Sequence, residues 1–300
     1  MPGVYNRCRM RMHACASMAI AALIGAPTVS SAQIPKQVFV SVTTTSGSPV
    51  VDLSPEDFTV RESSLSRKVT HAALANDTMR IALVVDSSEN VGQLLNQFRP
   101  GLQSFLDALP EPTEIGLMTI GRQARMRVAP TSDRKKLGDA IKGFFSDGGG
   151  SAALDGVIEG YDRILKKAEN RWPIIVLITT DGAAAGSTRE DEFERFMNAL
   201  RPTGVVAHAI VIALRGNGMP TVVAMDLTQA TGGSLQIIAA ATALPDRLKA
   251  LGERLASAHQ QAATQYRIEY LSESKDERSV EVGVERPGVR LSISDRRLVK

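Results

Sequence analysis

The chain has 300 residues, 43% of them hydrophobic and 22% charged, and a formal net charge of +3. This length allows one large domain or two smaller ones, with enough apolar residues for a sizeable core. So small an excess of positive charge gives no indication of nucleic acid or an anionic membrane as a partner.

The first 32 residues are typical of a secretory signal peptide. Residues 7–11 contain three arginines, residues 17–26 are apolar, and Ser30-Ser31-Ala32 provides small residues at a cleavage position. The apolar stretch is too short to span a bilayer, and no later run is both long and uncharged enough to do so. We therefore expect an exported protein, periplasmic or secreted after cleavage near Ala32, without a membrane span.

Removal of this segment changes both the cysteine content and the charge. Cys8 and Cys15 are the only cysteines of the chain, so the mature protein can have no disulfide. Its stability must then come from burial of apolar groups. The three arginines leave as well, so that 32 basic residues balance 32 acidic ones.

The mature chain begins with a pattern of short β-strands. Alternation predicts strands over three ranges separated by turn signals: Val38–Thr45, Phe58–Glu62 and Lys68–Leu74. Between the first two, Ser54 and Pro55 predict one turn of helix, with Ser54 as N-cap and Pro55 in the first position.

The middle of the chain alternates strands with helices. The predicted strands are Ile81–Val85, Glu114–Ile120, Ala124–Ala129, Trp172–Thr180, Gly204–Ala213 and Ser234–Ala239. The predicted helices are Val91–Leu106, Asp133–Phe144, Ala152–Ala168, Arg189–Leu200, Thr221–Thr231 and Pro245–His259. The third strand is antiparallel if residues 121–123 form a hairpin. This alternation predicts an α/β fold with a Rossmann-like, doubly wound, mostly parallel sheet covered by helices on both faces.

The end of the chain returns to strands, expected over Tyr266–Leu271, Arg278–Glu285 and Val289–Ile293. This piece is too short to fold alone, so we expect it to pair with the N-terminal strands in a small β-sandwich. The predicted organisation is a signal peptide over residues 1–32, an N-terminal β segment over 33–76, the α/β domain over 77–260 and a C-terminal β segment over 261–300.

Polar residues follow the two most apolar strands. Asp86-Ser87-Ser88 ends the run that starts at Ile81, and Asp181 ends the run of residues 172–180. In a doubly wound sheet these two strands are neighbours where the strand order reverses, and their loops converge with residues 148–151. Carboxylates and hydroxyls suit a hard cation such as Mg²⁺. Alternatively, Asp86 closes a turn and one of the serines caps the next helix.

These motifs resemble the von Willebrand factor type A domain, in particular that of exported bacterial VWFA-related proteins. The resemblance includes the flanks Val50–Arg61 and Tyr266–Leu271 and covers nearly the whole mature chain. It implies a metal-ion-dependent adhesion site that binds Mg²⁺ or Mn²⁺, with the candidate ligands Asp86, Ser88, Asn90, Ser151 and Asp181.

Two of these positions depart from the family pattern. Ser151 stands where the family has threonine, which keeps the hydroxyl. Asn90 stands where the family has a second serine, and its amide oxygen is an acceptable ligand for a hard cation. The amide could equally fill the place of the metal and donate to Asp86 or Asp181.

The resemblance implies a non-enzymatic binding module that recognises a protein or peptide through one of its acidic side chains. The first alternative is a metal-independent binding or scaffold protein in which the site is a structural remnant. The second is a metal-dependent hydrolase or phosphatase, which is disfavoured because no nucleophile–base pair is visible. The three histidines of the mature chain are expected on a strand (His71), on a buried strand (His208) and at an exposed helix end (His259).

Overall fold

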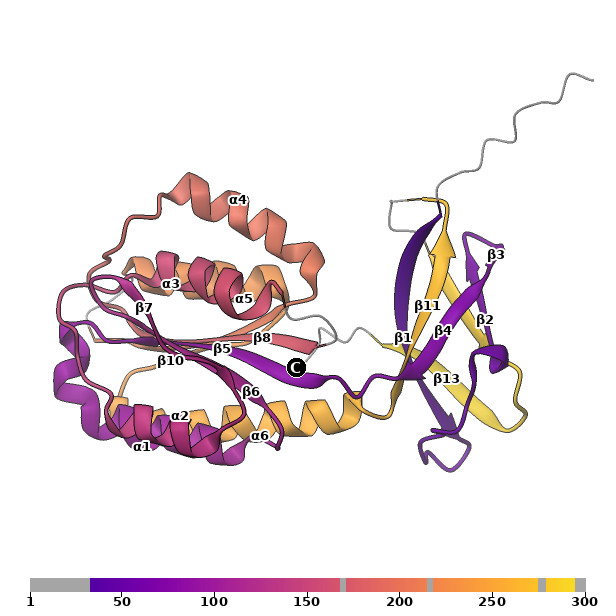
Figure 1. The fold of residues 1–300 in the computed structure, drawn as a ribbon, viewed down its shortest axis with the longest axis horizontal. Coiled ribbons are helices and arrows are strands. Elements are labelled where there is room, and N and C mark those ends of the chain that lie inside the picture. Colours follow the sequence, from indigo (N-terminus) through magenta and orange to yellow (C-terminus); the bar gives the residue numbers. More distant parts are fainter. Residues whose placement is uncertain (1–32, 168–170, 215–217, 275–278, 295–300) are drawn as a thin grey trace, which may run out of the picture.

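The computed structural model describes residues 33–167, 171–214, 218–274 and 279–294. The predicted signal peptide lies outside these ranges. Within them, no helix has both the length and the apolar character needed to cross a membrane. The described chain forms an α/β body and a separate β body, which lie at opposite ends of the molecule (Figure 1).

The α/β body is built on a six-stranded sheet in the order β10-β9-β8-β5-β6-β7. Its strands are β5 (Thr78–Asp86), β6 (Glu114–Ile120), β7 (Ala124–Thr131), β8 (Arg171–Thr180), β9 (Val206–Ile212) and β10 (Leu235–Ile238). All neighbours are parallel except β7, which forms the predicted antiparallel hairpin with β6. The chain runs outward from β5 to β7 and then returns to the other side of β5 as β8. The strand order therefore reverses between β5 and β8, which confirms the doubly wound fold.

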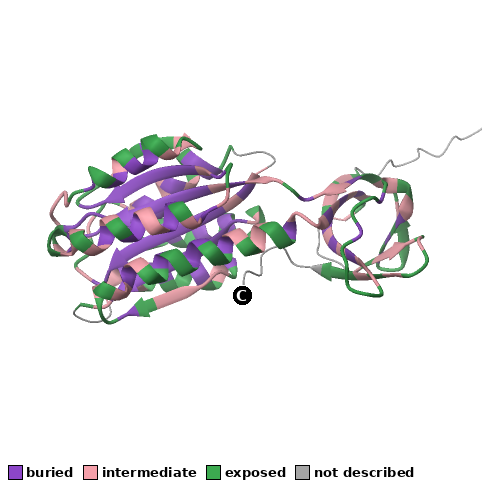
Figure 2. Cartoon of the chain, turned by 90° about the horizontal axis from the view of Figure 1, so that it is seen from below, coloured by how far each residue is buried: buried purple, intermediate pink, exposed green. Residues whose placement is uncertain are grey.

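Helices cover both faces of this sheet (Figure 1). One face carries α1 (Leu95–Ala108), α2 (Arg134–Lys142) and α6 (Leu244–Ala262), and the other carries α3 (Ala153–Gly160), α4 (Glu190–Leu200) and α5 (Met219–Thr231). The residues of β5 alternate between two apolar cores, with Ile81, Leu83 and Val85 in one and Ala82 and Val84 in the other. The apolar run is continuous because both faces of the strand are buried (Figure 2).

Two predicted helices differ in detail from the observed ones. The helix expected from Val91 begins as a 3₁₀-helix, η2 (Glu89–Leu94), before α1. The helix expected over Ala152–Ala168 divides into α3 and a π-helical turn, η3 (Tyr161–Leu165). Gly156 lets α3 lie close to the sheet, because a Cβ there would be 2.2 Å from Ile120 Cγ2. The other short helices are η1 (Pro55–Asp57), η4 (Arg201–Thr203) and η5 (Ala241–Ala243).

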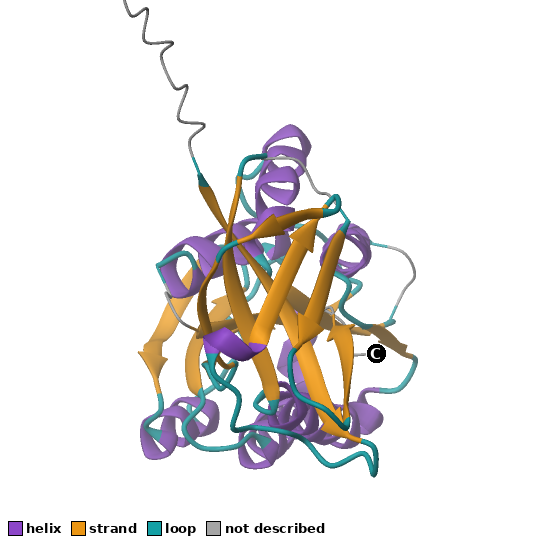
Figure 3. Cartoon of the chain, turned by 90° about the vertical axis from the view of Figure 1, so that its right-hand side faces the viewer, coloured by secondary structure: helices purple, strands orange, loops and turns teal. Residues whose placement is uncertain are grey.

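The β body consists of two antiparallel sheets, as the sandwich prediction required (Figure 3). One has the order β13-β1-β11-β4 and the other β12-β2-β3. The strands are β1 (Ile34–Thr44), β2 (Phe58–Glu62), β3 (Leu65–Arg67), β4 (Val69–Leu74), β11 (Gln265–Ser272), β12 (Val280–Val284) and β13 (Val289–Ser294). Each sheet thus combines N- and C-terminal strands around a shared core that includes Val40, Phe58 and Tyr266.

The predicted helical turn before β2 is confirmed as η1, with Ser54 as its N-cap. The carboxylate of Asp57 accepts hydrogen bonds from Ser54 N (2.7 Å) and Ser54 Oγ (3.0 Å). The hydroxyl of Tyr266 accepts a hydrogen bond of 2.8 Å from Leu53 N just before this turn. These bonds fasten the loop between β1 and β2 to the shared core.

Candidate metal-ion site

The five residues predicted to bind metal all lie at the carboxyl-terminal edge of the main sheet. Asp86 is the last residue of β5, and Asp181 directly follows β8. Ser88 is the N-cap of η2, Asn90 lies in its first turn, and Ser151 comes two residues before α3. This edge is the ligand-binding side of open α/β sheets, at the point where the strand order reverses.

Asp86 is fully buried and is held by donors from the neighbouring strand β8. Its Oδ2 accepts hydrogen bonds from Thr180 N (2.9 Å), Thr180 Oγ1 (2.8 Å) and Thr179 Oγ1 (3.2 Å). Its Oδ1 accepts one hydrogen bond of 2.8 Å, from Ser88 N. A buried carboxylate needs such compensation, because removal from water without hydrogen bonds is costly. The side chain is therefore fixed, with Oδ1 the less saturated oxygen.

Ser151 is joined to this arrangement through Thr179. The hydroxyls of Ser151 and Thr179 lie 3.3 Å apart, and both residues are buried. Ser151 N donates to Ala183 O at 2.8 Å, so the loop before α3 lies against the loop that follows Asp181. Gly150 permits this approach, since a Cβ there would be 2.6 Å from Ala183 O.

Asp181 and Asn90 both lie next to Gly182. Asp181 is almost fully buried, and its Oδ1 accepts a hydrogen bond of 2.7 Å from Leu214 N. Asn90 is half-buried, and its amide lies over Gly182, where an added Cβ would be 2.0 Å from Asn90 Nδ2. The fold thus brings all five predicted residues into one loop cluster.

The hydroxyl of Ser88 has no hydrogen-bond partner among the described residues, although it is buried. Buried polar atoms are rarely left unpaired, so this oxygen fits a site that holds a further group. The donor set consists of two carboxylates, two hydroxyls and one amide, all of which offer the oxygen ligands that hard cations prefer. The described part of the chain has no group of three or more His, Cys, Asp or Glu residues placed to hold a metal ion. A cation here would therefore depend on the hydroxyls and the amide.

Thr179 and Thr180 are site residues that the sequence analysis did not identify. Their signal was present, because two hydroxyl residues end a strand that is otherwise apolar from Ile174 to Ile178. Their role depends on the pairing of β8 with β5, which places them beside Asp86. Residue types alone did not indicate that contact.

A second missed feature is a polar bridge that holds the loop of residues 145–150 against Ser87. Ser87 Oγ donates to Asp147 Oδ2 at 2.9 Å, and Arg127 Nη2 donates to Asp147 Oδ1 at 2.7 Å. Burial opposes ionisation of Asp147, but the hydrogen bonds from Arg127 and Ser87 outweigh it and hold the pKa of its carboxyl below the usual value. Glu89 N also donates to Gly149 O at 3.0 Å. The bridge fixes the loop that leads to Ser151.

The histidines lie away from this cluster. His71 is exposed on β4, and His208 is buried on β9 with its Nδ1 2.9 Å from Ser234 Oγ. Burial, with a smaller contribution from the charge of Arg254, lowers the pKa of His208 to about 4, so the ring is neutral at physiological pH. The exposed position expected for His259 is wrong. α6 continues to Ala262, and the half-buried His259 ring stacks on Trp172 at a centroid distance of 5.6 Å.

A doubly wound α/β domain with an oxygen-lined cluster at its switch point is thus established. The family model for the von Willebrand factor type A domain matches residues 80–250, which is more than half of the chain. The chain belongs to this family. Domains of this family generally serve as protein-interaction modules.

Three solved structures are similar to this chain at low sequence identity, and the first of them shows the same fold. A von Willebrand factor type A protein from Catenulispora acidiphila is 12% identical, with a TM-score of 0.52 over 87% of this chain and 72% of that chain. The conserved hypothetical protein BatB from Bacteroides thetaiotaomicron is 15% identical, with a TM-score of 0.48 over 61% of this chain and 99% of that chain. Proximal thread matrix protein 1 from the mussel byssus, solved with a zinc-occupied MIDAS motif, is 16% identical, with a TM-score of 0.46 over 67% of this chain and 48% of that chain. A comparison with curated proteins found no match.

Proposed function

We propose that the protein is an exported, non-enzymatic interaction module that binds Mg²⁺ or Mn²⁺ and, through the ion, an acidic residue of a protein or peptide partner. The observation that carries the proposal is the unpaired, buried hydroxyl of Ser88 beside the Asp86 carboxylate. A buried oxygen without a hydrogen bond costs free energy, and coordination of a cation offsets this cost.

Asp86, Ser88, Asn90, Ser151 and Asp181 would hold the ion. When bound, the ion offers a coordination position to a carboxylate of the partner. Hydrogen bonds within the protein hold these ligand residues in fixed positions. Thr179 and Thr180 orient Asp86, Leu214 N orients Asp181, and the backbone bond from Ser151 to Ala183 fixes the two loops relative to each other. Export remains a proposal based on the N-terminal segment.

Metal-independent binding is the second candidate, and the position of Asn90 favours it. The Nδ2 end of the amide lies against Gly182, next to Asp181, where it can act as a donor in place of a cation. In that case the cluster is a structural remnant, and partners bind elsewhere on the surface. A hydrolase is disfavoured because, among the described residues, no histidine forms a hydrogen bond to a residue of the cluster.

Isothermal titration calorimetry with Mg²⁺ and Mn²⁺ on residues 33–300 tests the proposal. We expect a binding heat that Asp86→Ala abolishes and that Asp139→Ala, which removes an exposed helical carboxylate, leaves unchanged. No heat with either ion, or heat unaffected by Asp86→Ala, would contradict the metal-dependent function and favour the remnant.

A further inference from the structure

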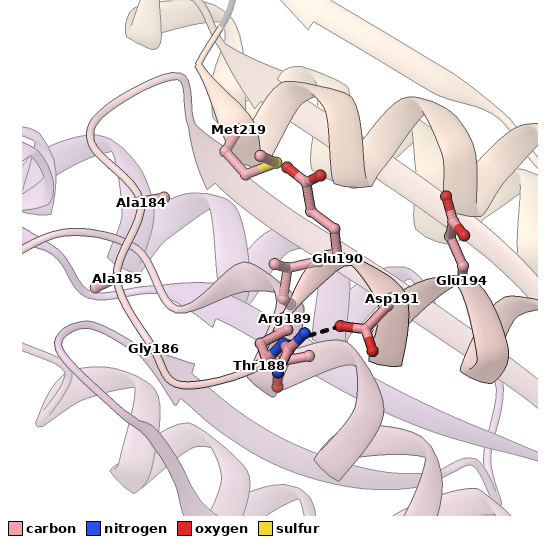
Figure 4. A pocket seen from close by; sticks show the side chains of 10 residues that line it. Ala184, Ala185, Gly186, Thr188, Arg189, Glu190, Asp191, Glu194 and Met219 are labelled. Carbon is pink, nitrogen blue, oxygen red and sulfur yellow. Dashed lines mark ion pairs between the residues drawn. The ribbon is translucent and has the colours of Figure 1, made fainter.

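A pocket of about 710 Å³, whose lining residues are shown in Figure 4, lies beside the loop that follows Asp181 of the candidate metal-ion site. One wall is the loop of Ala184 and Ala185, which lies three residues beyond Asp181 in the chain. Ala185 N donates to Ser151 O at 2.9 Å. Met219, which also lines the pocket, follows Gly218, whose backbone lies so close to Asp181 that a Cβ would be 2.5 Å from Asp181 O. The lining of the pocket is therefore connected by backbone contacts to the segments that carry Ser151 and Asp181.

The wall formed by residues 184–188 is held in place by Asp155 of α3. Its carboxylate accepts hydrogen bonds from Ser187 N (2.9 Å) and Thr188 N (2.7 Å). Gly186 has a φ of +104°, and a Cβ there would be 2.7 Å from Asp155 Oδ2, so the loop needs glycine at this position. The pocket is thus formed without a partner.

The lining has an apolar part and a charged rim of three acids and one arginine, Arg189. Leu154, Ala184 and Met219 provide apolar surface. Glu190 and Glu194 lie four residues apart on α4, both exposed, and neither forms an ion pair with any other described residue. The third acid of the rim, Asp191, is already paired with Arg189 and Arg195. Figure 4 shows the carboxylate of Glu190 reaching toward the side chain of Met219.

This combination suits a long cationic side chain. Two like charges at i and i+4 repel each other unless a cation lies between them. Lysine and arginine carry an apolar stem that can pack on Leu154 and Met219, and a charged end that can reach Glu190 and Glu194. A carboxylate or a purely apolar group would leave the two glutamates unpaired.

We propose that this pocket takes a lysine or arginine side chain from the same partner segment whose acidic residue reaches the metal-ion site. The inference rests on the proposed function and narrows it. The partner presents an acidic and a basic residue close together in sequence. The acidic residue of the partner binds at the metal-ion site. The pocket then favours acidic segments that also carry a lysine or arginine over those that do not.

A phage-displayed library of random linear heptapeptides, selected on immobilised residues 33–300 in Mg²⁺, tests this directly. We expect the selected peptides to be enriched in an acidic residue together with lysine or arginine. The Glu190→Gln/Glu194→Gln double variant should select acidic residues alone. The matched control Glu253→Gln/Glu281→Gln removes two exposed acids outside the pocket and should select as the native protein does.

A synthetic peptide with a selected sequence shows how much the basic residue contributes to the binding affinity. Replacing its basic residue by norleucine should weaken binding to the native protein about fivefold at low salt, the upper range for one exposed ion pair, and leave binding to the double variant unchanged. Enrichment of acidic residues without basic ones would overturn the pocket and retain the proposed function. Enrichment of basic residues without acidic ones, independent of Mg²⁺, would retain a cation-binding pocket and contradict the metal-dependent function. Enrichment of neither would overturn both.

Discussion

Asp86 is positioned by hydroxyl and amide donors of β8 and not by a cationic side chain of the described chain. Thr180→Val keeps the shape of the side chain and removes the donor that lies 2.8 Å from Asp86 Oδ2. Because hydrogen bonds to charged groups contribute about 1.5–3 kcal/mol, we expect the free energy of unfolding to fall by about 2 kcal/mol. Urea denaturation measures the free energy of unfolding. The control variant Thr59→Val, at an exposed strand position, should change this free energy by less than about 0.5 kcal/mol.

A substitution of Asn90 distinguishes the metal-dependent function from the metal-independent one. Asn90→Ser replaces the amide by the hydroxyl that the family pattern has at this position. If the amide is an imperfect ligand, this variant should bind Mg²⁺ more tightly than the native protein, by about tenfold, equivalent to about 1.4 kcal/mol. Calorimetry on both proteins gives the comparison. Native protein that binds no ion, together with a serine variant that does, would show that the amide fills the place of the metal.

At the scale of secondary structure elements, apolar pattern sufficed to predict most of the α/β body. The strand over Glu114–Ile120 was predicted to the residue, and the strands that end at Asp86 and Thr180 were predicted as neighbours. Fully buried strands give long apolar runs, and loop polarity marks their ends. The 3₁₀ start of the first helix and the π-helical turn after α3 were not predicted, since both depend on how a helix packs against the sheet.

The candidate site was predicted only where residue type indicates chemistry. Asp86, Ser88 and Asp181 offer oxygen ligands that a sequence motif can reveal. The hydrogen bonds of Thr179 to Asp86, of Ser87 to Asp147 and of the loops around Gly150 join segments far apart in the chain. Such contacts depend on register and loop path, which a single sequence does not specify.

The two sheets of the β body are tied together by a buried glutamate. The side chain of Glu62, on β2, is fully buried and contacts Lys36 Nζ (2.9 Å) and Ser272 Oγ (2.7 Å) on one sheet and Arg67 Nε (3.2 Å) on the other. Burial alone would raise the pKa of this carboxyl. The hydrogen bonds from Lys36 and Ser272 and the charges of Lys36 and Arg67 outweigh burial and lower it.

Glu62→Gln should therefore destabilise the β body by about 2 kcal/mol at pH 7, because it removes the buried negative charge that Lys36 and Arg67 share. A lowered folded-state pKa gives stability that is complete above the unfolded pKa of about 4.3 and is lost as pH falls through the folded pKa. The difference between the native protein and Glu62→Gln should accordingly shrink below about pH 4.3. Urea denaturation of both proteins from pH 7 to pH 3 measures this difference in the free energy of unfolding. A difference that does not depend on pH would contradict the ionised state of Glu62.

At the scale of the whole molecule, two bodies with separate cores meet at a narrow joint (Figure 1). The chain crosses the joint twice, through residues 75–77 and residues 263–264. Arg267 Nη1 donates to the carboxylate of Asp77 at 3.1 Å, and His259 Nε2 lies 2.9 Å from Asp77 O. Trp172, the single tryptophan of the sequence, stacks on His259 on the α/β side. Because few contacts connect the two bodies, we expect each body to unfold in a separate transition.

Two variants placed in different bodies test this independence. Trp172 emission reports unfolding of the α/β body, and hydrogen exchange of residues 34–74 reports opening of the β body. Glu62→Gln should accelerate exchange in residues 34–74 and leave the urea midpoint of Trp172 emission unchanged. Thr180→Val should do the reverse. If either variant shifted both signals by the same free energy, the bonds of Asp77 would couple the two bodies into one cooperative unit. Binding at the metal-ion edge would then stabilise the β body at the far end as well.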